Sequence, residues 1–106
     1  MYQFGDVVLL EHPYTDLTGV KLRPAIVLKY THDSDFITAR VTSQFRQTEY
    51  DIEVKDWKSA GLLLPPIIRV HKIATLETKL VKRNMGKLSA GDLDNLSQSI
   101  DTLFDF

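Results

Sequence analysis

The chain has 106 residues, no cysteine and a formal net charge of −1, which fits one small globular domain and excludes disulfides, thiolate nucleophiles and cysteine-bound metals. Its histidines, His12, His32 and His71, lack the spacing of a zinc site. No apolar run approaches the ~18 residues that span a membrane, and no signal peptide is visible. We therefore expect a single cytoplasmic domain over residues 1–106, without a metal or other cofactor.

The basic residues lie in the first part of the chain. Residues 88–106 contain Asp92, Asp94, Asp101 and Asp105 but no lysine or arginine, so residues 1–87 hold all 13 basic side chains. This asymmetry permits a basic face on the body of the domain, although a solvated surface beside an acidic helix is the simpler explanation.

Most of the chain has the pattern of β-strands. Apolar or alternating runs predict strands at residues 6–11, 24–30, 36–44, 50–55 and 67–76, and the last of these can continue to residue 81. Residues 31–35 have the composition of a hairpin turn, and residues 56–61 that of one helical turn ending at Gly61.

The clearest helix follows Ser89. Ser89 and Asp92 have the spacing of a capping box, and Leu88 with Leu93 that of a hydrophobic staple. One apolar stripe follows at helical spacing: Leu93, Leu96, Ile100 and Leu103. Short strands before one helix predict a mainly β fold, a small antiparallel barrel or strongly curved sheet with a C-terminal α-helix packed on it.

The stretch from Lys21 to Leu28 indicates an anion site. Arg23 and Pro24 directly precede a strongly apolar run, and a proline in a sheet belongs at a strand's first residue or at an edge. We therefore expect Arg23 where the loop from His12 to Gly19 enters the sheet, presenting a cation to a ligand. His12 itself either reaches the substrate or is an ordinary loop residue.

A second candidate pair is Arg69 and His71. Two residues apart in a predicted strand, they leave the same face about 7 Å apart, while Ile68 and Val70 face the core. Metal-free RNA cleavage can use such a pair, because arginine binds phosphate oxygens in a fork and histidine exchanges protons near neutral pH. The alternative is a surface arginine beside a histidine that only packs.

Other polar and aromatic residues have two interpretations each. Thr42 and Ser43 end the third predicted strand, where hydroxyls bind a phosphate or merely satisfy turn backbone. Tyr14, Phe45 and Trp57 can stack on bases, although Trp57 equally suits an anchor for a short helix.

In order and spacing, these fragments resemble the MazF/PemK family of toxin endoribonucleases over almost the full length. The fragments are Gly5–Leu9, Arg23–Leu28, Val41–Gln44, Ile67–Leu76 and Gly86–Ser89 with the helix after it. The resemblance implies an SH3-like or plasmid-maintenance-toxin barrel, a homodimer, and metal-independent, sequence-specific cleavage of single-stranded RNA through a 2′,3′-cyclic phosphate. It also implies a cognate antitoxin whose acidic, flexible tail blocks the RNA groove.

The resemblance also implies roles for single residues. By motif position, Arg23 matches the family's active-site arginine, Thr42 its threonine or serine, and Arg69 the arginine of an Arg-x-Asp motif found in some members. His71 stands where those members have aspartate, so it either transfers the proton or is not catalytic. The residues expected to contact RNA are His12, Lys21, Ser43 and Gln44.

Two other functions remain open at this point. A barrel of this kind can bind RNA or a protein partner without cutting, and the histidine at position 71 favours that alternative. A toxin fold can also act on a protein target such as a topoisomerase, but the Arg-Pro and Thr-Ser fragments favour RNA.

Overall fold

The computed structural model describes residues 1–11, 22–44, 48–62 and 66–105. The strands are β1 (Asp6–Glu11), β2 (Leu22–Tyr30), β3 (Asp35–Thr42), β4 (Asp51–Glu53), β5 (Ile67–Glu77) and β6 (Val81–Lys87). A 3₁₀ helix, η1 (Thr78–Leu80), joins β5 to β6, and helix α1 (Ala90–Leu103) follows. The predicted mainly β fold with a C-terminal helix is confirmed. No helix in these ranges is long and apolar enough to cross a membrane.

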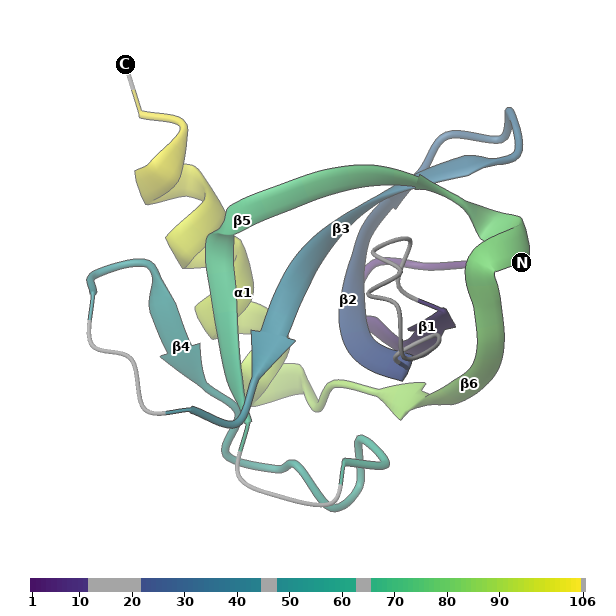
Figure 1. Cartoon of the computed structure of the whole chain (residues 1–106). Coiled ribbons are helices and arrows are strands. Elements are labelled where there is room, and N and C mark those ends of the chain that lie inside the picture. Colours follow the sequence, from purple (N-terminus) through teal and green to yellow (C-terminus); the bar gives the residue numbers. More distant parts are fainter. Residues whose placement is uncertain (12–21, 45–47, 63–65, 106) are drawn as a thin grey trace.

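The six strands form one sheet in the order β4-β5-β3-β2-β1-β6, and every neighbouring pair is antiparallel. Figure 1 shows the sheet curling strongly, so that β5, η1 and β6 sweep around the space beside β1 and β2. The possible continuation of the fifth predicted strand to Val81 is wrong. η1 interrupts the chain there, and Val81 begins a separate edge strand that pairs with β1.

Apolar clusters cover both faces of the sheet. The helix-side core includes Val7, Ile26, Ala39, Val41, Ile68, Val70 and Leu96. The concave core consists of Val8, Leu10, Ala25, Val27 and Phe36. Successive residues of β1 and β2 belong to different cores, because side chains alternate between the faces of a strand. This explains why both strands have continuous apolar runs instead of an alternating pattern.

Helix α1 begins as predicted, with one difference at Asp92. The Ser89 hydroxyl accepts a hydrogen bond from the Asp92 backbone N–H at 3.3 Å. The Asp92 carboxylate, only 2% exposed, accepts bonds from the backbone N–H groups of Lys55 and Asp56, each at 3.0 Å. It therefore ties the segment after β4 to the helix start. The apolar stripe is confirmed, since Leu96 is fully buried and the stripe's other three residues pack on the same core.

The segment after β4 ends as a helix does. Gly61 N–H donates to the Lys58 carbonyl at 3.1 Å and Leu62 N–H to the Trp57 carbonyl at 3.0 Å, the two bonds of a Schellman motif. Gly61 has φ +83°, and a Cβ there would lie 2.1 Å from the Met85 carbonyl oxygen of β6. The predicted turn ending at Gly61 is confirmed, and Trp57 packs against the helix-side core.

Candidate active site

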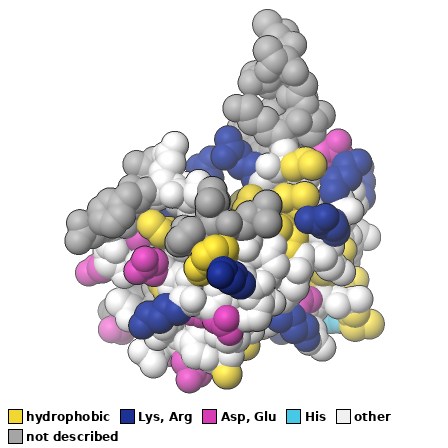
Figure 2. All heavy atoms as spheres, turned by 90° about the horizontal axis from the view of Figure 1, so that it is seen from below, with side chains coloured by type: hydrophobic (Ala, Val, Ile, Leu, Met, Phe, Trp, Pro, Cys, Tyr) yellow, Lys and Arg dark blue, Asp and Glu magenta, His cyan; other side chains and the backbone are white. Residues whose placement is uncertain are grey.

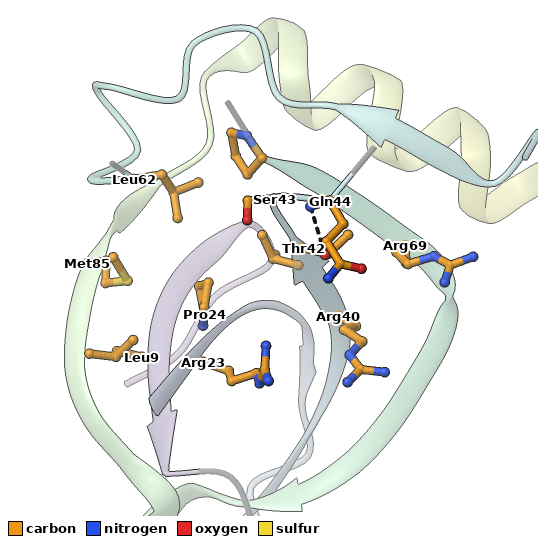
Figure 3. Close-up of a pocket in the computed structure, with 12 residues that line it drawn as sticks. Leu9, Arg23, Pro24, Arg40, Thr42, Ser43, Gln44, Leu62, Arg69 and Met85 are labelled. Carbon is orange, nitrogen blue, oxygen red and sulfur yellow. Dashed lines mark hydrogen bonds between the residues drawn. The ribbon is translucent and has the colours of Figure 1, made fainter. Parts of the chain in front are cut away.

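A cavity of about 470 Å³ lies where residues of β2, β3 and β5 meet, and we call it the main cavity. Its polar lining consists of Arg23, Arg40, Thr42, Ser43, Gln44 and Arg69. The apolar lining consists of Leu9, Pro24, Val41, Leu62, Pro66 and Met85 (Figure 3). The structure therefore brings together five of the residues that the sequence identified, from three distant segments.

Arg23 lies in the part of β2 that is paired with one neighbouring strand only. This strand pairs with β1 from Leu22 onward but with β3 only from Ala25, so Arg23 and Pro24 precede the second ladder. A proline is tolerated at such a position, as expected from the sequence. The Arg23 side chain is exposed, and in Figure 3 it extends into the space that the strands enclose.

Arg69 is held by a carboxylate from the neighbouring strand. Its Nε donates to Asp51 Oδ1 at 2.9 Å, and the two side chains are 17% and 1% exposed. Thr48 donates to Asp51 Oδ2 through its backbone N–H at 3.0 Å and through its hydroxyl at 2.8 Å. Burial alone raises the pKa of Asp51, but the Thr48 bonds and Arg69 outweigh burial and lower this pKa below 3.8. Asp51 is thus charged and fixes the Arg69 guanidinium, which Figure 3 shows directed away from Thr42.

His71 lies behind Arg69 and does not line the main cavity. The shared face of the two residues is confirmed, since Ile68 and Val70 are fully buried. His71 Nε2 is 3.3 Å from Arg69 Nη2, and because arginine only donates, Nε2 accepts and Nδ1 carries the proton. That Nδ1 is buried without a partner, and the ring centroid lies 5.8 Å from that of Tyr50. One ring nitrogen is therefore engaged by Arg69 and the other is buried.

Thr42 satisfies turn backbone, one of the two roles that the sequence left open. Its Oγ1 accepts a hydrogen bond from the Gln44 backbone N–H at 3.1 Å, drawn as the dashed line in Figure 3. This bond shapes the end of β3 and places Ser43 and Gln44 on the cavity wall. The hydroxyl proton of Thr42 is still available to donate to an anion.

Arg40 was missed by the sequence analysis. It lies on β3, opposite Ala25 of β2 on one side and Arg69 of β5 on the other. The alternation of Thr38, Arg40 and Thr42 places Arg40 on the same strand face as Thr42, a signal that was available. Asp51 was also missed, because its place among alternating charged residues is typical of a solvated face.

Several expected residues fall outside the described ranges, namely His12, Tyr14, Lys21 and Phe45. Within those ranges, no group of three or more His, Cys, Asp or Glu side chains is arranged to hold a metal ion.

The main cavity has uncompensated positive charge. Among the residues that the structure describes, Arg23 and Arg40 have no ion-pair partner, and Arg69 has one. On the face shown in Figure 2, basic and acidic side chains are interspersed and form no continuous basic patch. The unpaired guanidinium groups of Arg23 and Arg40, in one cavity with the Thr42 hydroxyl, suit a phosphate group.

The family profile of PemK-like, MazF-like toxins of type II toxin–antitoxin systems matches residues 3–104. The chain belongs to this family. The recognition made from the sequence fragments is thereby confirmed. No curated protein sequence matches this toxin.

Solved structures share the fold of this toxin at low sequence identity. An endoribonuclease in complex with its cognate antitoxin, from a mycobacterial species, is 14% identical, with a TM-score of 0.78 over 96% of this chain and 93% of that chain. The Mycobacterium tuberculosis toxin MazF-mt6 is 20% identical, with a TM-score of 0.77 over 95% of this chain and 97% of that chain. A MazE–MazF structure from Deinococcus radiodurans is 16% identical, with a TM-score of 0.76 over 96% of this chain and 94% of that chain.

Proposed function

We propose that this toxin is a metal-independent endoribonuclease that cleaves single-stranded RNA, sequence-specifically, through a 2′,3′-cyclic phosphate. Its family and its fold, which solved endoribonucleases share, support RNA cleavage. The observation that carries the proposal is that Arg23, Thr42 and Arg69, from three segments, line one cavity together with Arg40. A site of this kind stabilises the negative charge that develops on a phosphate during transfer.

The reaction forms one bond to phosphorus and breaks another. The 2′-oxygen attacks the scissile phosphorus and loses its proton, while the bond to the 5′-oxygen breaks and that oxygen gains a proton. Arg23 and Arg40 bind the non-bridging oxygens and stabilise the pentacovalent intermediate. Thr42 donates its hydroxyl proton to the same phosphate, and Arg69, fixed by Asp51, supplies preorganised positive charge.

The candidates for proton transfer are judged by whether they line the main cavity. The described residues that line the main cavity include no histidine, aspartate or glutamate. His71 acts on Arg69 through Nε2, so we treat it as a positioning residue. His12, which lies outside the described residues, remains the candidate from the sequence for moving the proton.

The proposed partners follow from the charge of the site. A cavity lined by three arginines suits the acidic tail of a cognate antitoxin, which would compete with RNA for the same cations. A mycobacterial structure with this fold was solved with its cognate antitoxin. We also propose a homodimer and a cytoplasmic location, where the messenger RNA substrate is found.

The direct test is cleavage of a panel of single-stranded RNAs by the purified toxin in EDTA. We expect products with 5′-hydroxyl and 2′,3′-cyclic phosphate ends, and no cleavage by Arg23→Ala. Because Arg23 is exposed, this variant should change the free energy of unfolding by less than ~0.5 kcal/mol. Lys29→Ala, an exposed cation outside the main cavity, is the matched control. If folded wild-type protein leaves every RNA intact, the enzyme is excluded.

The role of His71 is tested by the pH dependence of cleavage. Glutamine offers an oxygen that can accept from Arg69, so His71→Gln should retain the wild-type pH profile. His71→Ala should lose roughly 10- to 100-fold in rate, because a hydrogen bond to a charged group contributes about 1.5–3 kcal/mol. Loss of one limb of the pH profile in His71→Gln would instead assign the proton transfer to His71.

A second candidate function is a module that binds RNA without cutting it. The lack of a carboxylate or histidine among the described cavity-lining residues favours it. In that case a mobility shift would retain intact RNA, with affinity falling as salt rises.

A further inference from the structure

A second hollow of about 190 Å³ adjoins the main cavity. Arg23, Pro24 and Arg40 line both, so the two lie side by side. The hollow adds one further cation, Lys72, and a floor that includes Leu10, Ala25, Ala74 and Leu76. We call this hollow the flanking subsite.

An irregularity in β5 brings Lys72 to this place. From Ala39 to Arg40, a single step along β3, the partner on β5 changes from Ile73 to Arg69. The intervening residues of β5 have no partner on β3, and Val70 N–H bonds to the Tyr50 carbonyl instead, at 3.0 Å. If side chains alternated regularly along β5, Lys72 would point to the same buried side of the sheet as Val70. The bulge redirects it to the concave face, where it is exposed and lines the hollow with Arg40.

The charges of the flanking subsite are uncompensated. Within the described part of the chain, neither Arg40 nor Lys72 forms an ion pair, whereas Arg69 does. Among the residues that the structure describes, no acidic side chain lines the hollow. Three cations, Arg23, Arg40 and Lys72, share this small hollow without a counter-ion among the described residues, which favours an anion there.

The floor offers apolar surface to a base. Apart from the cations, the polar side chain among the described residues that line the hollow is Thr38, which is 3% exposed and whose hydroxyl donates to the Ala74 carbonyl at 3.2 Å. A nucleobase over this aliphatic floor would make apolar contact and stack on an arginine, and stacking of this kind accepts every base. The subsite is therefore suited to a nucleotide of any base.

We propose that the flanking subsite binds the RNA nucleotide next to the scissile phosphate. Lys72 pairs with the phosphate of that nucleotide, and Arg40 lies between this phosphate and the scissile one. The inference rests on the proposed function and adds to it the direction of the RNA, from the main cavity along β3 and β5. It also predicts that base specificity is weak at this nucleotide.

The experiment measures binding of a randomised-sequence 2′-O-methyl RNA, which cannot be cleaved, by fluorescence anisotropy over a range of salt. Lys72→Gln should reduce the slope of log K against log salt by about 0.7, the value of one phosphate contact on a single strand. The matched control is Lys29→Gln, another exposed lysine of the sheet that lines neither hollow; its slope should equal that of the wild type. With cleavable RNA, Lys72→Gln should raise KM and leave kcat unchanged, because the contact is present before and during the reaction.

The outcomes separate the two proposals. If the wild type cuts RNA but Lys72→Gln behaves like Lys29→Gln, the flanking subsite is refuted and the enzyme stands. If the wild type neither cuts nor binds RNA, both proposals are refuted. If Lys72→Gln weakens binding of polyglutamate but not of RNA, the hollow binds acidic protein and the nucleotide assignment is wrong.

Discussion

The ion pair between Asp51 and Arg69 is predicted to stabilise both the fold and the candidate active site. Asp51→Asn keeps the shape of the side chain but removes its charge. The carboxylate now accepts from Arg69 Nε on one oxygen and from two Thr48 donors on the other. An asparagine has a single acceptor oxygen, so its NH₂ group must face a donor on one side.

The expected magnitude follows from the burial of the pair. Hydrogen bonds to a charged group contribute about 1.5–3 kcal/mol each, and breaking a fully buried ion pair costs about 3–5 kcal/mol. Arg69 is 17% exposed, so solvent compensates part of that cost. We expect Asp51→Asn to lower the free energy of unfolding by roughly 2–3 kcal/mol, at the lower end of these ranges.

A double-mutant cycle in urea isolates the pair. Asp51→Asn, Arg69→Gln and the double variant should give a coupling energy of about 1–2 kcal/mol. The control cycle uses Lys79 and Glu77, which are 3.2 Å apart but 76% and 58% exposed, and should give less than ~0.5 kcal/mol. Equal coupling in the two cycles would refute the argument that Asp51 anchors Arg69. Asp51→Asn should also slow RNA cleavage, because Arg69 is then free to leave its position.

Two further predictions concern stability. The pKa of Asp51 is lowered in the folded state, so on acidification the unfolded state takes up the proton first. The stabilisation by the charged carboxylate is complete above the unfolded-state pKa of 3.8, and it is lost as the pH falls through the lower pKa of the folded state. Urea midpoints measured from neutral to acid pH should therefore fall less steeply in Asp51→Asn, and parallel curves would contradict this. Asp92→Ala leaves the Lys55 and Asp56 N–H groups without their acceptor and should cost about 2–4 kcal/mol of unfolding free energy, with kcat unchanged; a loss under 0.5 kcal/mol would show that other groups satisfy these donors.

Most of the fold was predictable because its signals are local. Apolar runs, one turn composition and the pattern after Ser89 predicted five of the six strands and the helix. Strand β6 was missed because its sequence, from Val81 to Lys87, contains neither an apolar run nor an alternating pattern. Pairing with β1 and the close approach of Gly86 to Ala60 position this strand. Such tertiary contacts have no signature within the strand itself.

The candidate site was predictable where a residue's role depends on its own segment. Arg23 beside Pro24 and Thr42 at a strand end are of this kind, and both line the main cavity. Arg40 and Lys72 depend on the register between β3 and β5, which includes a bulge that no periodicity reveals. Sequence reasoning therefore found Arg23 and Thr42, which lie near strand ends, and missed Arg40 and Lys72, whose places depend on how β3 and β5 pair.

The histidine at position 71 and the aspartate at position 51 are best understood together. Relatives with an Arg-x-Asp motif place a carboxylate two residues after the arginine, whereas this toxin has His71 there. The structure nevertheless provides a carboxylate for Arg69, since Asp51 of the adjacent strand lies 2.9 Å from its Nε. His71 Nε2 lies 3.3 Å from Nη2 of the same guanidinium. This arginine is thus held by two side chains, Asp51 and His71, so its position does not depend on a carboxylate at residue 71, and the departure from the motif is no argument against catalysis.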